Sequence, residues 1–210
     1  MDRQMRNEGI LIVVSGFSGA GKGTLMKRLV EEYDGYALSI SATTRKPRPG
    51  EEEGREYFFL SREQFEKRIE DHALIEHAEY CGNYYGTPRD YVEKKLSEGR
   101  DVILEIEIQG ALKIKEQYPD ALLLFVSTPD AAELRRRLSG RGTETEEVIQ
   151  KRLCRAAKEA EGIEEYDYIV VNDDLETCVK ELHGIIDAAH HAPRRNEAFI
   201  KKMRRELEEN

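Results

Sequence analysis

Short apolar runs alternate along the chain with longer segments in which apolar residues recur at helical spacing. The run Ile10–Ser15 predicts a buried strand, and Lys22–Tyr33 follows it as a helix with Leu25 and Leu29 on one face. Further strands are expected at 37–41, 102–108, 121–127 and 168–171. Further helices are expected at 62–71, 110–117, 130–138, 146–161 and 175–189. Alternating strands and helices predict an α/β fold with a mostly parallel sheet covered on both faces.

Two segments interrupt this alternation and are expected to be insertions on the sheet. Residues 43–96 open with the Pro-, Gly- and charge-rich stretch RKPRPGEEEGRE, and residues 137–152 are dense in Arg, Gly and Glu. The expected division is a core of 1–42, 97–136 and 153–192, an inserted lobe of 43–96, a lid of 137–152 and a tail of 193–210.

The tail has an amphipathic pattern, because Phe199, Met203 and Leu207 recur at helical spacing with basic residues between them. This pattern predicts a terminal helix. The helix either packs on the core of its own chain or contacts a second copy, so the chain is expected to be a monomer or a homodimer.

Length, charge and cysteine spacing narrow the class of protein. A chain of 210 residues suits one α/β domain with small lobes, and its net charge of −9 disfavours nucleic-acid binding through an overall basic surface. The longest apolar runs, 10–14 and 121–126, are far shorter than the roughly 18 residues of a membrane-spanning helix. The N-terminal MDRQMRNEG lacks a signal-peptide pattern, and the three cysteines are too scattered for a disulfide framework. We therefore expect a cytoplasmic protein without nucleic-acid or membrane partners.

The strongest chemical signal is GFSGAGKGT, residues 16–24, which lies between the first predicted strand and the first predicted helix. Gly16 and Gly21 bracket four residues and Lys22 follows, which is the phosphate-loop (P-loop) spacing in its strand–turn–helix context. Glycines let backbone amides converge on phosphate oxygens, and the helix N-terminus adds partial positive charge. The ATP phosphates are expected to bind at Gly16, Ser18, Gly19, Ala20, Gly21, Lys22, Gly23 and Thr24.

The position after Lys22 departs from the usual motif. Gly23 stands where Ser or Thr normally supplies a hydroxyl ligand to Mg²⁺, and Thr24 follows one place later. Either Thr24 contributes to the metal site, or waters and phosphates hold the ion. Adenylate kinases carry the same GKGT sequence at this place. In this respect the loop resembles that of nucleoside monophosphate kinases.

The stretch SISATTRKPRPGEEEGREYFF, residues 39–59, gathers positive charge locally. Arg45 and Arg48 lie three positions apart in a proline-restrained loop, so their guanidinium groups can hold one phosphate from two sides. Tyr57 can add a hydroxyl donor. Taken alone, either arginine is better explained as part of a solvated charged loop, and only the full string favours phosphate binding.

The pattern SxSxTTRxPRxGExxGxxYxF in this stretch resembles the acceptor-binding signature of guanylate kinases. The stretch LIEHAEYCGNYYGTP, residues 74–88, resembles the guanine-binding stretch of the same family, and the whole resemblance covers about residues 10–189. It implies a P-loop three-layer αβα core with an inserted GMP-binding lobe and an arginine-rich lid. It also implies transfer of the γ-phosphoryl group of ATP to GMP, with dGMP as a further expected acceptor.

The resemblance assigns roles in GMP binding by position. Glu76 and Thr87 would bind the base, because guanine presents N1–H and a 2-amino group as adjacent donors that one carboxylate can accept together. Adenine offers no such pair, and a site built on these bonds can reject the wrong base by roughly 10⁴ or more. The GMP phosphate would be held by Ser41, Arg45, Arg48, Tyr57 and Tyr85.

The predicted strand DVILEIEIQG carries two acids at positions where guanylate kinases commonly have Asp. An acid after a buried strand near the phosphate loop usually organises Mg²⁺, so Glu105 is the expected metal residue, together with Thr24. Glu107 is expected near the guanine amine. The extra methylene group of Glu moves each carboxylate by about one carbon–carbon bond relative to Asp.

Residues 134–153 resemble the lid of the family. Closing a lid excludes water and brings arginines onto the transferring phosphoryl group. Asn172, after the last core strand, would contact adenine, although an Asn there could also cap the following helix. The side chains expected to neutralise charge during transfer are Lys22, Arg45, Arg137, Arg141 and Arg152.

The expected mechanism is direct in-line transfer, because the GMP phosphate is already ionised and needs no general base. A kinase for AMP or dTMP is one alternative, against which Glu76 and Thr87 argue. Another is a guanylate-kinase-like protein-binding module. Such modules typically lack a working phosphate loop and lid arginines, whereas this chain has both. A further role as a GTP sensor is left open.

Overall fold

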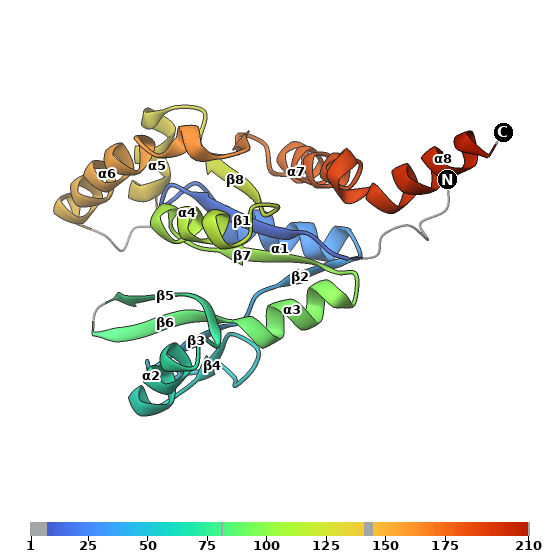
Figure 1. Cartoon of the computed structure of the whole chain (residues 1–210). Helices are drawn as coiled ribbons and strands as arrows, with labels where there is room; N and C mark the ends of the chain where they lie inside the picture. The colour runs from blue at the N-terminus through green and yellow to red at the C-terminus, as the bar shows by residue number, and fades with distance from the viewer. Residues whose placement is uncertain (1–7, 81, 141–144, 210) are drawn as a thin grey trace.

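The central feature of the structure is a parallel sheet of five strands (Figure 1). The structure is a computed structural model that describes residues 8–80, 82–140 and 145–209. The strands lie in the order β2-β7-β1-β8-β9, so β1 is in the middle, with Val13 opposite Leu104 on one side and Leu123 on the other. Their bounds are β1 (Leu11–Gly16), β2 (Tyr36–Leu38), β7 (Asp101–Glu105), β8 (Leu122–Ser127) and β9 (Tyr168–Val171).

Helices cover both faces of this sheet, which confirms the expected three-layer αβα core. Side chains alternate along β1, so Ile12 and Val14 join a cluster with α1 and α7, while Leu11 and Val13 join a cluster with α3 and α4. All four side chains are buried. The helix bounds are α1 (Lys22–Glu32), α3 (Arg89–Ser97), α4 (Ile108–Gln117) and α7 (Leu175–His190).

A second, smaller sheet forms a separate layer beside the core (Figure 1). Its strands lie in the order β4-β3-β6-β5, and α2 (Arg62–Glu70) packs on it through Phe65, which clusters with Ala42 and Leu74. Ser61 begins α2 with a capping box to Gln64. The strand bounds are β3 (Ser41–Thr43), β4 (Tyr57–Phe59), β5 (Leu74–Tyr80) and β6 (Asn83–Pro88).

Two helices, α5 (Ala131–Ser139) and α6 (Glu146–Ala160), pack on each other at the carboxyl ends of the core strands. Leu134 and Leu138 of α5 face Ile149 of α6, and Phe17 of the glycine-rich turn packs against this cluster. The short helices η2 (Ile163–Glu165) and η3 (Pro193–Arg195) follow α6 and α7 in the chain. Through Phe17, the α5–α6 pair packs against the segment that follows β1.

Two predicted strands differ from the structure. The expected strand 37–41 is divided between β2 in the core sheet and β3 in the second sheet, because the chain leaves the core after Ser39 bonds to the Ile103 carbonyl. The expected strand 102–108 ends at Glu105, and α4 begins at Ile108 rather than Gly110. Ile106 and Ile108 continue the apolar alternation in sequence, yet they pack around the start of α4.

The tail forms the predicted amphipathic helix, α8 (Glu197–Glu208), which extends away from the body (Figure 1). Of the two alternatives for this helix, packing on the core of its own chain is wrong, since all of its residues keep at least partial exposure and Phe199 and Met203 are 40% and 38% exposed. Contact with a second copy stays a prediction. Within the described ranges, no helix is long and apolar enough to span a membrane.

Removing the Phe65 ring should destabilise the lobe, because this side chain is fully buried and stacks on Tyr84. We expect Phe65→Ala to lower the free energy of unfolding by about 3–5 kcal/mol, the usual cost of a cavity left by a large aromatic residue. Urea unfolding measures this loss. Phe199→Ala makes the same chemical change on the exposed α8, so an equal loss there would contradict the packing argument.

Candidate active site

A glycine-rich turn, residues 16–21, joins the carboxyl end of β1 to the first turn of α1. Gly19 and Gly21 have φ angles of 98° and 89°, in the left-handed region that favours glycine. A Cβ atom on Gly21 would lie 2.6 Å from Nδ2 of Asn172, and one on Gly19 would lie 2.9 Å from Cδ2 of Leu138. The turn therefore needs glycine at both positions, and it presents the N-terminus of α1 to an anion.

Lys22, the first residue of α1, lies folded against this phosphate loop. Its Nζ donates to the carbonyl oxygens of Gly16 at 2.7 Å and Phe17 at 3.3 Å. Burial lowers the pKa of the Lys22 ammonium, and nearby carboxylates, Glu105 foremost, oppose that shift. The two bonds keep the ammonium at the loop, where phosphate oxygens can replace the carbonyl oxygens as its partners.

Asn172 is buried beside the phosphate loop and supports it directly. Its Nδ2 donates to the Ala20 carbonyl oxygen at 2.8 Å. Arg137 donates to the Asn172 carbonyl oxygen at 2.8 Å and to that of Ala20 at 3.4 Å. The cap of α7 is Asp174, whose Oδ1 accepts from the Thr177 amide at 2.9 Å. Asn172 is thus not the cap, and its adenine contact stays a prediction.

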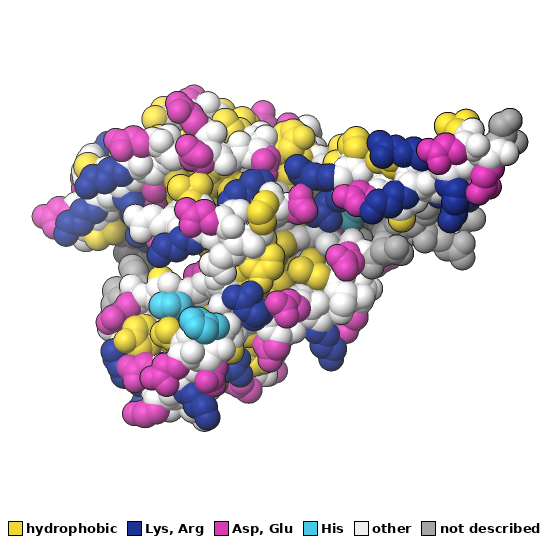
Figure 2. All heavy atoms as spheres, viewed as in Figure 1, with side chains coloured by type: hydrophobic (Ala, Val, Ile, Leu, Met, Phe, Trp, Pro, Cys, Tyr) yellow, Lys and Arg dark blue, Asp and Glu magenta, His cyan; other side chains and the backbone are white. Residues whose placement is uncertain are grey.

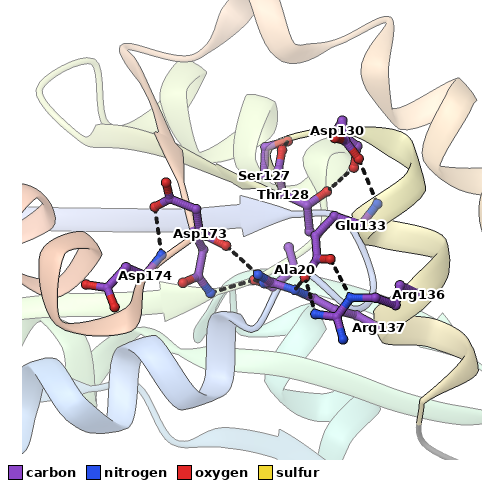
Figure 3. Close-up of polar contacts among 10 residues, drawn as sticks. Ala20, Ser127, Thr128, Asp130, Glu133, Arg136, Arg137, Asp173 and Asp174 are labelled. Carbon is purple, nitrogen blue, oxygen red and sulfur yellow. Dashed lines mark hydrogen bonds and ion pairs between the residues drawn. The ribbon is translucent and has the colours of Figure 1, made fainter.

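Glu133 orients Arg137, although no sequence motif singled it out (Figure 3). Its Oε1 accepts from Nε of Arg137 and its Oε2 from Nε of Arg136, both at 2.6 Å. These two guanidinium groups lower the pKa of Glu133 to about 2. The spacing of four residues between Glu133 and Arg137 on one helix was the available signal in the sequence.

Two of the predicted lid arginines come from different helices. Arg152 of α6 donates from Nη1 to Oγ of Ser18 at 3.2 Å, and Arg137 reaches the loop from α5. Arg141 lies outside the described residues. Two of the three predicted lid arginines therefore contact the phosphate loop or its immediate support.

The lobe brings most of the predicted phosphate-binding side chains together. Ser41 lies opposite Tyr57 across β3 and β4, and Tyr85 lies on β6, the other neighbour of β3. The Tyr57 and Tyr85 ring centroids are 6.1 Å apart, and Cζ of Arg45 lies 5.3 Å from the Tyr57 ring centroid. These four side chains, from distant parts of the sequence, form one cluster on the second sheet.

Glu51 holds the arginine loop in place, although Glu51 was not among the predicted site residues. Its Oε1 accepts from Nη2 of Arg45 at 2.9 Å, and its Oε2 accepts from the Arg48 amide at 2.7 Å. These bonds lower the pKa of the Glu51 carboxyl, which therefore stays charged between the two arginine positions. The Glu in the GExxG part of the signature was the signal present in the sequence.

Glu76 and Thr87 meet across β5 and β6. The Thr87 hydroxyl, which is fully buried, donates to Oε1 of Glu76 at 2.8 Å. Burial raises the pKa of the Glu76 carboxyl, because taking it out of water disfavours the charged form. A Cβ on Gly110 would lie 3.9 Å from Oε2 of Glu76, so that second oxygen faces the start of α4.

The two acids at the end of β7 and just beyond it have different surroundings. Desolvation raises the pKa of the Glu105 carboxyl and the nearby Lys22 opposes this shift, although part of the side chain meets solvent. Glu107 is the N-cap residue of α4 and forms an ion pair with Arg155 of α6. Thr24 is exposed in the first turn of α1. The predicted metal and guanine roles of these residues stay predictions.

The surface is hollowed between the α4–α6 side of the core and the β5–β6 side of the lobe (Figure 2). The phosphate loop lies at the carboxyl edge of the parallel sheet in a three-layer αβα core. This is the arrangement of phosphate-loop nucleotide-binding proteins. Comparison with known proteins narrows this class. Residues 8–189 match the guanylate kinase family, and the chain belongs to that family.

Individual guanylate kinases are similar in sequence to this chain over most of its length. The guanylate kinase of Desulfitobacterium hafniense (strain Y51) is 54% identical over 86% of this chain and 90% of the relative. The guanylate kinase of Caldanaerobacter subterraneus subsp. tengcongensis is 48% identical over 96% of this chain and 98% of the relative. The crystal structure of guanylate kinase from Anaplasma phagocytophilum aligns with a TM-score of 0.68 at 34% identity, over 87% of this chain and 86% of that one. The chain is accordingly an enzyme of the nucleoside monophosphate kinase type.

Burial of Glu76 has a consequence for stability. An acid whose pKa is raised on folding destabilises the fold once it ionises. The loss develops as the pH rises through the ordinary Glu pKa, about 4.3, and is complete above the raised value. We expect Glu76→Gln to raise the free energy of unfolding at pH 7 and to leave it nearly unchanged at pH 3.

Urea unfolding at both pH values measures this difference. Glu79→Gln is the matched control, since Glu79 is an exposed acid on the same strand and should change stability little at either pH. A stability gain at pH 3 as large as at pH 7 would show that packing of the amide, and not the charge, is responsible.

Proposed function

We propose that this chain transfers the γ-phosphoryl group of ATP to GMP, giving ADP and GDP, and accepts dGMP as well. The observation that carries the proposal is the Glu76–Thr87 pair, set in a lobe that also gathers arginine and tyrosine side chains. The ATP phosphates would bind the amides of residues 16–24, and the adenine ring would lie against Asn172.

Guanine suits the Glu76–Thr87 pair chemically. The carboxylate can accept from N1–H and the 2-amino group together. Once those donors occupy the carboxylate, the Thr87 hydroxyl can turn from Glu76 and donate to O6. Adenine has neither the donor pair nor the acceptor at that position, so it would leave buried polar groups unpaired, and such sites discriminate by roughly 10⁴ or more.

The GMP phosphate would bind the cluster on the second sheet. Glu51 holds Arg45 and the Arg48 backbone before any substrate arrives, which lowers the cost of ordering this loop on binding. Tyrosine hydroxyl groups supply further donors. The proposed phosphate-binding side chains are Ser41, Arg45, Arg48, Tyr57 and Tyr85.

Mg²⁺ is the proposed cofactor, and the donors present fit the usual way of binding this ion. The described residues contain no group of three or more His, Cys, Asp or Glu side chains arranged to hold a metal. Glu105 supplies a carboxylate near Lys22, and Thr24 supplies an exposed hydroxyl. Mg²⁺ typically takes one or two carboxylates and keeps waters and substrate phosphates as its other ligands. When bound, it neutralises charge on the β- and γ-phosphate oxygens.

The residues of the chain act by positioning and by neutralising charge. Lys22 would exchange its two loop carbonyl partners for β- and γ-phosphate oxygens. Arg45 and Arg48 would aim an ionised GMP oxygen at the γ-phosphorus, so no general base is needed. Closure over the site would exclude water and limit ATP hydrolysis. The lid arginines proposed to surround the developing charge are Arg137, Arg141 and Arg152.

We also propose the division of labour within the chain and its setting. Residues 43–96 would form the GMP-binding lobe and residues 137–152 the lid, both carried by the phosphate-loop core. The enzyme would act in the cytoplasm as a monomer or homodimer, with ATP and GMP as its small-molecule partners and without nucleic-acid or membrane partners.

The test is a coupled assay of ADP production from ATP and Mg²⁺, with GMP, AMP, dTMP or CMP as the acceptor. We expect rapid turnover with GMP alone among these four. Arg45→Ala should lower kcat/KM for GMP by roughly tenfold to a hundredfold, because a hydrogen bond to a charged group is worth about 1.5–3 kcal/mol. Lys67→Ala, at an exposed position on α2, should leave kcat/KM unchanged.

Other outcomes point to other functions. Turnover with AMP or dTMP in place of GMP would contradict the guanine role of Glu76. Binding of GMP without turnover on any acceptor would indicate a binding module. In that case Gly23, Glu105 and Glu107, where the chain departs from common motifs, become the positions to restore.

Glu51→Gln should raise KM for GMP by roughly threefold to tenfold, since the amide keeps the shape of the carboxylate but weakens a charge-assisted bond to Arg45. Steady-state kinetics at saturating ATP measure the change. The effect should shrink in the Arg45→Ala background, because both changes remove the same interaction. Equal effects in both backgrounds would mean that Glu51 acts independently of Arg45.

A further inference from the structure

An ion pair joins α6, the helix that carries the end of the proposed lid, to the guanine side of the site. Nη2 of Arg155, on α6, contacts Oε1 of Glu107, the N-cap residue of α4. The same guanidinium is held on its own helix, where Nε donates to Oε1 of Glu159 at 2.8 Å, one turn further along. Arg155 is therefore fixed from α6 and reaches across to α4.

The two candidate guanine acids are held in the same way. Thr87 donates to Oε1 of Glu76, and Arg155 contacts Oε1 of Glu107, so in each case Oε1 has a partner and Oε2 can accept from a further donor. Oε2 of Glu76 faces the start of α4 near Gly110, and Glu107 caps that same helix end. Both acids thus lie around one end of α4.

Glu107 needs such a partner more than Glu76 does. Its side chain is 70% exposed and its carboxylate makes no capping bond to the start of α4. An exposed, freely rotating glutamate loses conformational freedom when it binds a ligand, and fixing it beforehand removes part of that cost. An arginine already held by Glu159 can provide this fixation.

We propose that Arg155 is a positioning residue for guanine recognition: it holds Oε1 of Glu107 so that Oε2 accepts from the 2-amino group of the base. This inference rests on the proposed GMP kinase function. Arg155 itself touches neither the base nor the phosphates. Its effect passes through Glu107, and it is specific to substrates that carry the 2-amino group.

The position of Arg155 on α6 links base recognition to the phosphate loop. Arg152, one turn earlier on the same helix, donates to Ser18 of that loop at 3.2 Å. A placement of α6 that fixes Glu107 therefore also brings Arg152 to the loop.

Inosine monophosphate (IMP) is the probe, because it matches GMP except for the missing 2-amino group. We expect Arg155→Ala to lower kcat/KM for GMP by roughly threefold to tenfold, the range of effects that ordering one side chain gives. The same variant should leave kcat/KM for IMP unchanged. Arg155→Lys should recover part of the loss, and Lys158→Ala, which removes a positive charge elsewhere on α6, should change neither substrate.

A second measurement tests the route through Glu107. In a Glu107→Ala background, adding Arg155→Ala should cause no further loss with GMP. Urea unfolding of each variant checks that the fold is intact. We expect each variant to remain folded under the assay conditions, so that the loss with GMP does not come from unfolded protein.

Three results would overturn the inference. Equal losses with GMP and IMP would show that Arg155 only steadies α6. A gain with GMP would show that Arg155 competes with the base for Glu107. No change with either substrate would show that Arg155 has no role in recognising the base. In that case a wild-type preference for GMP over IMP would still support the proposed function. Absence of wild-type turnover on GMP would instead contradict the proposed function itself.

Discussion

The arrangement of the site depends on one buried strand, β1, which hydrogen-bonds to a parallel neighbour on each side. Because all five core strands are parallel, their carboxyl ends meet at one edge of the sheet. The phosphate loop leaves β1 there, Glu105 ends β7, and Asn172 follows β9. The hydrophobic packing of β1 against helices on both faces therefore places chemically unrelated residues beside one another.

Several charged residues of the proposed site have a partner that holds them before a substrate binds. Glu51 holds Arg45, Glu133 holds Arg137, and Thr87 holds Glu76. The chain carries a net charge of −9, yet its acids stand among the arginines that the site needs. Partners of this kind reduce the rearrangement of side chains that is needed when phosphates bind. Phosphoryl-transfer enzymes lower the reaction barrier mainly by positioning the substrates and by electrostatic stabilisation from groups already in place.

Local patterns predicted the first strand, the loop and the first helix closely, because periodicity and the need for glycine are properties of neighbouring residues. The same reasoning failed where the chain changes direction without a change in pattern. Apolar alternation continues past Leu38 and past Glu105, while the backbone passes into another sheet or into a helix. The amphipathic pattern of α8 likewise predicted a helix but not the surface that it would meet.

The sequence by itself determined the class of the protein, since the phosphate loop and the acceptor signature are short, contiguous strings whose chemistry depends on spacing. The tertiary structure decided which side chains support them. Asn172 bonds to Ala20 from 152 residues away, and Arg155 reaches Glu107 on another helix. Such pairs depend on how the helices pack on the sheet, which is a property of the whole core and leaves no local pattern in the chain.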